Sequence, residues 1–494
     1  MERSSGILLH ITSLPGKYGI GTMGREARSF IDFLVDSGQK LWQILPLGHT
    51  GYGDSPYQCF SAFAGNPLII DLEKLQEQGL LKPEDLPDNE GFPEDAVNYG
   101  KVFAYKYTLL EKAWQNFQKA DDHGLKQQYG TFCTGNQWWL DDYAFFMALK
   151  IHHGGIAWTQ WEKDIKMREP DAVEKYRNLL AGKIDFYRFL QFVFYHQWLE
   201  LKSYANINNI KIIGDLPLYV AFDSADAWAN PDIFDFDETL TPRTVAGVPP
   251  DYFSETGQMW GNPIYDWKRL EEQGFRWWIE RIKANFLLYD ILRIDHFRGL
   301  AAYWSIPYGE ETAINGKWIE APGRAMLRAV YDSLGEKPII AENLGVITPD
   351  VEQLREEFSM PGMKILQFAF DSGEDNDFIP HTYEKNSVVY TGTHDNNTTE
   401  GWFRHSPEED RQLMREYFCL DENNPSWSFI RLAWSTVSNI AIAPMQDILG
   451  LGEEARMNFP GKSPGFWKWR YRSDMLTGNH ADDLRRITRI YGRL

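Results

Sequence analysis

The sequence predicts an α/β protein, a closed (β/α)8 TIM barrel with large, mainly helical insertions. Three observations lead to this fold class. Short, almost continuously apolar runs alternate with amphipathic helical patterns, as in parallel sheets that are buried on both faces. Eight such runs can be counted, and a clear helix pattern precedes every later run except the seventh. Eight strands with six intervening helices fit a closed barrel better than an open doubly wound sheet.

Each element has its own local pattern. Residues 27–34 place four apolar side chains at i, i+3, i+4 and i+7, and Gly38 stands where a helix would end. The other predicted helices are residues 186–204, 267–288, 324–334, 350–358 and 426–437. The predicted strands are residues 6–10, 41–47, 210–216, 291–295, 338–342, 363–370, 387–393 and 439–444.

The spacing of the strands predicts two insertions in one catalytic barrel that spans residues 1–494. About 160 residues separate the second strand from the third, which is too long for a single loop of a compact domain. We therefore expect residues 49–209 to form a helical subdomain. A second insertion is expected at residues 221–290, where the Gly- and aromatic-rich loop 249–263 has the composition of a lid.

Composition and charge exclude several classes of protein. The formal net charge is −20, which repels phosphate backbones and anionic lipid, so we expect no nucleic-acid or membrane partner. No apolar run reaches the roughly 18 residues of a membrane span, and the first residues do not resemble a signal peptide. The three cysteines have no metal-ligand spacing and are expected to be free thiols. We expect a soluble, cytoplasmic protein.

Aromatic residues make up 15% of the chain. Most of these rings are expected to fill a large core. Some could instead be exposed platforms for a flat-faced, polyhydroxylated ligand such as a sugar.

Acidic residues stand at the carboxyl ends of four predicted strands. They are Asp215, Asp295, Glu342 and Asp395. One charged residue at a strand end commonly marks only the point where the strand meets water. Four of them in one barrel would converge on the axis, at the face where barrel enzymes assemble their active sites.

Converging carboxylates suit cleavage of glycosidic bonds. One ionised carboxylate attacks the anomeric carbon, while a second, kept protonated by its surroundings, protonates the leaving oxygen. Arg293 and Asp295 alternate along one strand and so point to the same face, where the guanidinium favours the ionised aspartate. His394 adds a donor for sugar hydroxyl groups beside Asp395.

These residues resemble the three catalytic regions of the α-amylase superfamily. Further stretches resemble one branch of it, the 4-α-glucanotransferases called amylomaltases or disproportionating enzymes (glycoside hydrolase family 77). The resemblance covers essentially the whole chain. It implies a barrel without the C-terminal β-domain usual in α-amylases, which fits the little sequence that follows the eighth strand. The matching stretches are residues 5–14, 53–58, 214–228, 247–266 and 456–461.

The resemblance also implies a role for each site residue. Asp295 would be the nucleophile, Glu342 the acid/base and Asp395 the residue that distorts the bound glucose ring. Substrates would be α-1,4-glucans such as maltodextrins and amylose, with glucose as an acceptor, and neither a metal nor an organic cofactor would be needed. Substrate-binding residues would be Arg293, His394, Asp215, Tyr57, Ser55, Asp251, Gln258, Trp260, Asn458 and Pro460.

Four alternatives stay open from the sequence. A hydrolase of the same superfamily would use the same carboxylates, since only the acceptor site and the exclusion of water distinguish the two reactions. A nicotinamide-dependent oxidoreductase is suggested by the GxGxxG pattern at residues 19–24, but no strand runs directly into its first glycine. A metal-dependent barrel hydrolase lacks an HxH pair on the first strand. A non-catalytic glucan-binding protein would not explain the carboxylates.

Overall fold

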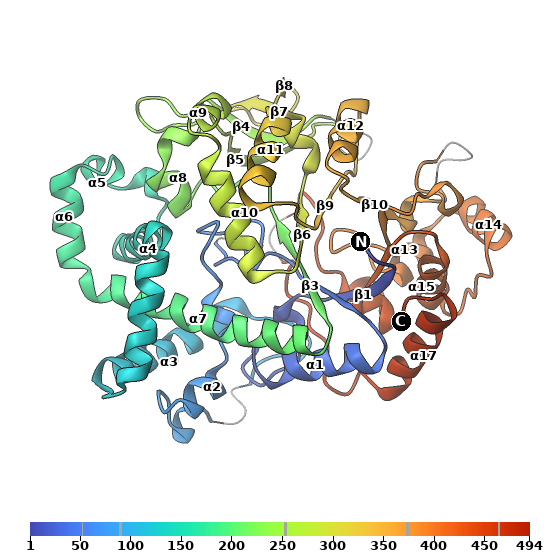
Figure 1. Cartoon of the computed structure of the whole chain (residues 1–494), viewed down its shortest axis with the longest axis horizontal. Coiled ribbons are helices and arrows are strands. Elements are labelled where there is room, and N and C mark those ends of the chain that lie inside the picture. The colour runs from blue at the N-terminus through green and yellow to red at the C-terminus, as the bar shows by residue number, and fades with distance from the viewer. Residues whose placement is uncertain (52, 88–90, 251–253, 372–375, 463–464) are drawn as a thin grey trace.

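The computed structural model describes residues 1–51, 53–87, 91–250, 254–371, 376–462 and 465–494. Its centre is a closed barrel of parallel strands, which confirms the predicted fold class (Figure 1). All eight predicted strands are present, and around the barrel their order is β1-β2-β3-β6-β9-β10-β11-β12. Their bounds are β1 Ser4–Leu8, β2 Leu41–Gln43, β3 Lys211–Leu216, β6 Ile291–Ile294, β9 Ile339–Ala341, β10 Gly362–Ile365, β11 Ser387–Tyr390 and β12 Ile440–Pro444.

The strands are apolar along their length because both of their faces are buried. Ile212 in β3 belongs to the large apolar cluster that the surrounding helices cover. Its neighbour Ile213 belongs to a second cluster, built from the other face of the same strands, together with Leu8 and Ile340. This double burial is the physical origin of the continuous apolar runs in the sequence.

Seven helices surround the barrel in the described part of the chain. Neighbouring pairs in this ring, such as α1 with α7 and α10 with α11, are in contact. The predicted helix at 267–288 is in fact two helices, α9 (Trp267–Glu272) and α10, because Gly274 and Phe275 adopt left-handed backbone angles between them. The ring consists of α1 Arg25–Asp36, α7 Ala181–Ile207, α10 Arg276–Leu288, α11 Gly323–Leu334, α12 Pro349–Glu357, α15 Pro425–Ser435 and α17 Gly478–Ile490.

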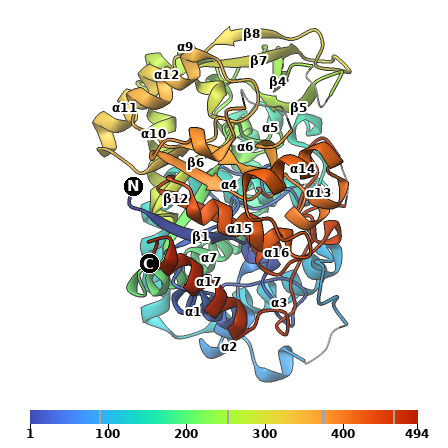
Figure 2. The ribbon, with the colours of Figure 1, turned by 90° about the vertical axis from the view of Figure 1, so that its right-hand side faces the viewer.

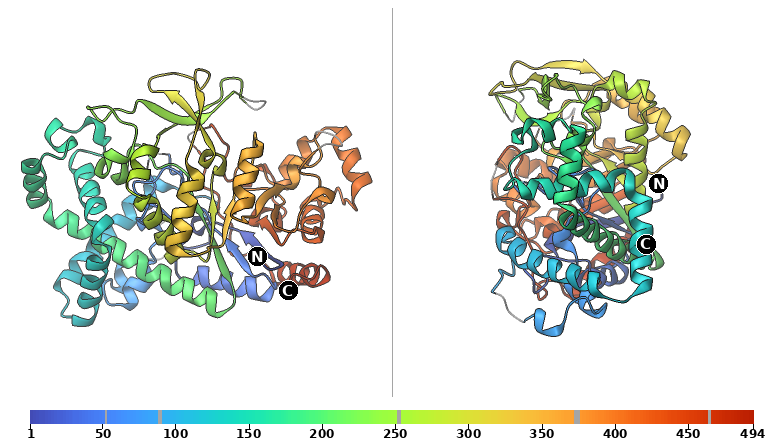
Figure 3. Two further views of the ribbon diagram at one scale, coloured as in Figure 1. Left: turned by 45° about the horizontal axis from the view of Figure 1, so that its top comes forward. Right: turned by 90° about the vertical axis from the view of Figure 1, so that its left-hand side faces the viewer.

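Within the described residues, all regular elements between β2 and β3 are helices. This segment extends to one side of the barrel, at the left of Figure 1 and facing the viewer in the right panel of Figure 3. Its longest helix, α4, packs along α7. The helices that precede α7 are α2 Leu72–Glu77, α3 Tyr99–Lys119, α4 His123–His152, α5 Lys163–Lys166 and α6 Pro170–Leu179.

A small antiparallel sheet, which the sequence analysis did not predict, lies above one side of the barrel (Figure 2). Its order is β5-β4-β7-β8, so strands before and after β6 meet in one sheet. The interpretation of residues 249–263 as a loop was therefore wrong for 258–263, which form β5. The bounds are β4 Thr244–Val248, β5 Gln258–Pro263, β7 Ala302–Pro307 and β8 Lys317–Glu320, and α8 (Ala225–Ala229) and α9 accompany them.

The first and last barrel strands pair with each other and close the barrel. Arg3 donates to the carbonyl oxygen of Ser438 at 3.1 Å, although 435 residues separate the two in sequence. Arg493 donates to the carbonyl oxygens of Ser4 and Asn439, at 2.9 and 3.1 Å, and so joins the beginnings of both strands.

Other features complete the described chain. Helices α13 (Thr399–His405) and α14 (Glu408–Tyr417) lie between β11 and α15, and α16 (Met445–Ile448) follows β12. None of the helices within the described ranges combines the length and apolar character that a membrane span requires. Cys59, Cys133 and Cys419 are unpaired.

Candidate active site

An ion-pair network joins the ends of β3 and β6. Asp215 and Arg293 are register partners on these two strands. Nη1 of Arg293 lies 2.7 Å from both carboxylate oxygens of Asp215 and 2.9 Å from Oδ1 of Asp295. The side chain of Asp215 is fully buried, whereas that of Asp295 is 28% exposed. Burial raises the pKa of Asp215, and the charge of Arg293 opposes that rise. Arg293 thus favours the ionised form of Asp215 and forms an ion pair with Asp295.

Glu342 follows β9, the next strand of the barrel, and has a different environment. Its carboxylate accepts hydrogen bonds from the backbone N–H groups of His296 (2.7 Å) and Leu344 (3.0 Å). Burial raises its pKa to about 8 and the charge of Asp295 adds to the rise, whereas Arg293 and the two N–H groups oppose it. A carboxyl group of this kind is protonated at neutral pH and can act as an acid.

His296 brings these groups together through its backbone. It adopts a left-handed conformation, with φ of +51°, directly after Asp295. This turn aims its N–H at Glu342, and the next residue, Phe297, donates to the carbonyl oxygen of Glu342 at 3.2 Å. The strained turn therefore links the nucleophile candidate to the acid candidate.

Asp395 lies in the loop after β11. Its Oδ1 accepts a hydrogen bond from the side-chain amide of Asn458 at 2.6 Å, and its Oδ2 lies 3.4 Å from Nε2 of His394. Burial alone would raise the pKa of Asp395, but His394, Asn458 and Arg293 together lower it to about 2. Arg456 donates to the backbone oxygen of Asp395 at 2.7 Å. The segment that contains Arg456 and Asn458 therefore holds Asp395 in place and ionised.

An aromatic stack covers one side of the carboxylates. The ring of Tyr57 stacks on His394, with centroids 5.2 Å apart and planes 16° apart, and Trp467 packs against both rings. The Tyr57 hydroxyl donates to Asp215 at 2.9 Å. The sequence analysis missed Trp467, because nothing in the local pattern of its loop distinguishes it from a core aromatic residue.

Gln258 and Trp260 lie at the other side of the site, on β5. Nε1 of Trp260 donates to Oε1 of Gln258 at 3.2 Å. The ring of Trp260 meets the ring of His296 edge-on, with centroids 4.8 Å apart. The small sheet thereby carries two predicted substrate-binding residues to the turn that contacts Glu342.

Among the described residues, Ser55 and Pro460 are not brought into direct contact with the carboxylates. The hydroxyl of Ser55 accepts a hydrogen bond from the backbone N–H of Tyr57 at 3.3 Å. Ser55 is therefore linked to the carboxylates through Tyr57. Pro460 is exposed in a turn after Asn458. Asp251 lies outside the described residues.

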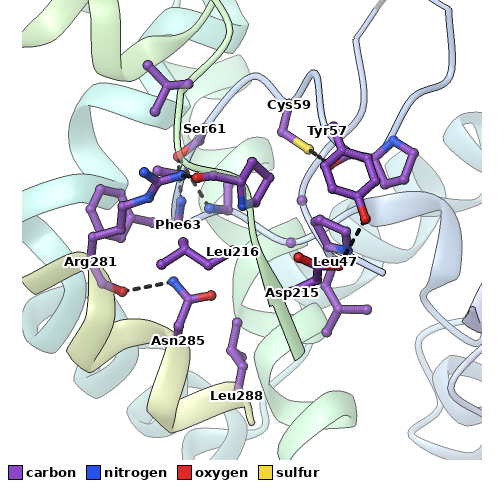
Figure 4. Close-up of a pocket in the computed structure, with 18 of the residues that line it drawn as sticks. Leu47, Tyr57, Cys59, Ser61, Phe63, Asp215, Leu216, Arg281, Asn285 and Leu288 are labelled. Atoms are coloured by element: carbon purple, nitrogen blue, oxygen red, sulfur yellow. Dashed lines mark hydrogen bonds between the residues drawn. The ribbon is translucent and has the colours of Figure 1, made fainter. Parts of the chain in front are cut away.

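A cavity of about 60 Å³ lies behind this site, between the ends of β2 and β3 and helix α10 (Figure 4). Asp215 and Tyr57 line one side of it, and Arg281 lines the other. The buried Arg281 donates to the carbonyl oxygens of Pro217 and Leu218, at 2.7 and 3.0 Å. Helix α10 therefore holds the backbone that directly follows Asp215.

The barrel and its carboxylates define an enzyme built for glycosidic-bond chemistry. The family model described as 4-alpha-glucanotransferase matches residues 9–477, and the chain belongs to that family. This confirms the resemblance drawn from the sequence, and transfer of α-1,4-glucan segments is accordingly the activity of the chain.

Sequence relatives and solved structures similar to this chain carry names of the same family. The 4-alpha-glucanotransferase of Synechocystis sp. is 52% identical, over 100% of this chain and 98% of its own length. That of Clostridium butyricum is 51% identical, over 98% of this chain and 100% of its own. The amylomaltase of Streptococcus agalactiae, solved in complex with acarbose, is 44% identical and superposes with a TM-score of 0.97 over 100% of both chains.

Proposed function

We propose that the chain transfers glucan segments by double displacement with retention at the anomeric carbon. Asp295 attacks the anomeric carbon while Glu342 gives its proton to the leaving 4-oxygen, so the C–O bond breaks as the covalent glycosyl-enzyme forms. Glu342 then takes the proton from the 4-hydroxyl of an acceptor glucan or glucose, whose oxygen displaces Asp295. Each proton and each bond is accounted for without a cofactor.

One observation carries this proposal. Two carboxyl groups follow paired neighbouring strands, β6 and β9, in opposite environments. Asp295 is bonded to a guanidinium, whereas Glu342 is desolvated and, within the described residues, its carboxylate is bonded only to backbone N–H groups. The raised pKa of Glu342 suits a proton donor, and the guanidinium beside Asp295 suits a carboxylate that attacks the anomeric carbon, which supports this division of roles.

The other groups are proposed to bind the sugar. Asp395, ionised and held by Asn458, would bind and distort the donor glucose, with Arg293, His394, Asp215 and Tyr57 around the same ring. Gln258, Trp260, Asn458 and Asp251 would line the donor and acceptor subsites, with Ser55 and Pro460 at the edges. Acarbose, the ligand in the Streptococcus agalactiae structure, is expected to occupy the same site here.

Maltotriose as sole substrate tests the reaction. Glucose together with a ladder of longer oligomers is the expected outcome, because each glycosyl unit passes to another sugar. Shorter sugars alone would show that water is the acceptor and would overturn transfer in favour of hydrolysis. Proton NMR of the longer oligomers tests retention, since a β configuration at the newly formed glycosidic bond would contradict the nucleophilic role of Asp295. The cytoplasmic location stays a prediction.

A further inference from the structure

Asp447 is a buried acid outside the carboxylate cluster. It lies in α16, directly after β12, and is 1% exposed. Its carboxylate accepts three hydrogen bonds. Oδ2 accepts from the hydroxyl groups of Thr391 (2.6 Å) and Thr399 (2.7 Å), and Oδ1 accepts from the backbone N–H of Thr399 (2.8 Å).

The two threonines mark the two ends of one loop. Thr391 is the first residue after β11, and Thr399 is the first residue of α13. His394 and Asp395 lie between them. Asp447 therefore bridges both ends of the loop that carries Asp395.

The middle of this loop has contacts of its own with other segments, among them one from the backbone N–H of Asn458 to the carbonyl oxygen of His394 at 3.1 Å. Gln367 donates to the carbonyl oxygen of Asn397 at 2.9 Å, and Arg456 and Asn458 hold Asp395 as described above. These contacts fix single points, whereas Asp447 fixes the distance between the loop's two ends. Neighbouring strands β11 and β12 are paired, so the bridge ties the loop to the rigid barrel wall.

A buried carboxylate is costly unless it is well satisfied. Within the described residues, no Lys, Arg or His side chain forms an ion pair with Asp447, and burial raises its pKa. An apolar side chain of similar size would fill the space at lower cost but could not bond both threonines. The presence of a carboxylate at this buried position is thus explained by the hydrogen bonds with which it joins the two ends of the loop.

We propose that Asp447 is a positioning residue for glucan transfer, acting by holding the loop 391–399 so that Asp395 meets the donor sugar. This inference rests on the role proposed for Asp395. Displacement of a reacting or binding group by about 1 Å can cost about 100-fold in rate, so a bridge that fixes the loop length affects catalysis without contact to substrate.

Asp447→Ala and Asp447→Asn test the proposal in the full-length enzyme. Asp447→Ala removes all three bonds, and we expect kcat/KM for maltotriose to fall about 10–100-fold, chiefly through kcat. Asp447→Asn keeps an oxygen for the Thr399 N–H, and its amide can donate to both hydroxyl groups. We expect Asn to recover activity to within about fivefold of wild type, because the bridge rather than the charge is required.

Asp71 offers a matched control. It is also a buried aspartate that accepts from a threonine hydroxyl, Thr22 at 2.6 Å, and from a backbone N–H, that of Lys74 at 2.9 Å. It caps α2 rather than the active-site loop. Asp71→Ala should lower the melting temperature but leave kcat unchanged when assayed well below that temperature.

If Asp447→Ala does not fold, Thr391→Val replaces it, since valine keeps the shape and removes one bond. We expect a loss of about 3–10-fold in kcat, restored by Thr391→Ser. A folded Asp447→Ala or Thr391→Val enzyme with wild-type kcat would overturn the proposal, as would a loss of kcat in Asp71→Ala of equal size. Asp395→Asn separates the two hypotheses: if it remains active, the role of Asp395 fails and the inference that rests on it fails too, whereas an inactive Asp395→Asn enzyme beside a fully active Asp447→Ala enzyme overturns the role of Asp447 alone.

Discussion

The carboxylate of Glu342 accepts a 2.7 Å hydrogen bond from the backbone N–H of His296, the residue that directly follows Asp295. One turn of the main chain thus sets the position of the proposed acid relative to the proposed nucleophile. This hydrogen bond favours the ionised carboxylate and lowers the pKa of Glu342. Burial has the larger effect and raises that pKa to about 8. The position of Glu342 is therefore fixed by the backbone and its protonation by desolvation.

Replacing Glu342 by Gln should abolish both proton transfers and keep the shape. We expect transfer between maltotriose molecules to fall at least about 10²–10⁴-fold, measured as glucose release. A maltosyl fluoride donor needs little protonation of its leaving group, so the glycosyl-enzyme on Asp295 should accumulate and be visible by mass spectrometry. Glu357→Gln, on the exposed side of α12, is the control. Near wild-type transfer by Glu342→Gln would contradict the assignment.

The pH dependence follows from the protonated form of Glu342. Because the acid is protonated below its pKa of about 8 and loses its proton above it, kcat/KM should decline as pH rises through about 8. Asp395, with a pKa of about 2, stays ionised over the same range and adds no alkaline limb. A profile of kcat/KM from about pH 5 to 10 checks this. An unchanged alkaline limb in the residual activity of Glu342→Gln would assign the limb to another group.

Arg293→Met should destabilise the fold as well as the site. It leaves the fully buried Asp215 without its cation, and removal of one partner of a buried pair costs about 3–5 kcal/mol in the free energy of unfolding. Urea unfolding of the variant measures this loss. Adding Asp215→Asn should restore part of the stability but none of the activity. Equal stability of the single and double variants would show that the unpaired charge is not the cause.

Tyr57→Phe separates the ring of Tyr57 from its hydroxyl. The ring still stacks on His394, but Asp215 loses a 2.9 Å hydrogen bond. Hydrogen bonds to charged groups contribute about 1.5–3 kcal/mol, so we expect kcat/KM to fall about 10–100-fold. Tyr57→Ala should lose more, since the stack is lost too. If Phe and Ala variants are equally active, the stack contributes nothing to transfer.

The barrel could be predicted from the sequence because its strands are buried on both faces, which leaves short but continuously apolar runs. The small sheet could not, because its strands are partly exposed: β8 has no buried residue, and β5 is only partly covered. Their partners also lie on both sides of β6 in sequence, so no hairpin pattern marks all of the pairs.

The carboxylates could be placed because parallel strands end at one face of a barrel. Trp467 could not, because its position depends on contacts with Tyr57 and His394, far away in sequence. Ser55 and Pro460 were assigned to the site only by resemblance, and loop backbones have no register that places their side chains.

The pairing of β1 with β12 also has a consequence for synthesis on the ribosome. At about 5–20 residues per second, the 435 residues between Arg3 and Ser438 take roughly 20–90 s to appear. Until then β1 has only β2 as a possible partner, and its other edge is open to pairing with other chains. The newly made chain therefore depends on protection of that edge for most of its synthesis. Slow translation would increase the aggregation of unfinished chains, while the catalytic rate of the finished enzyme would stay the same.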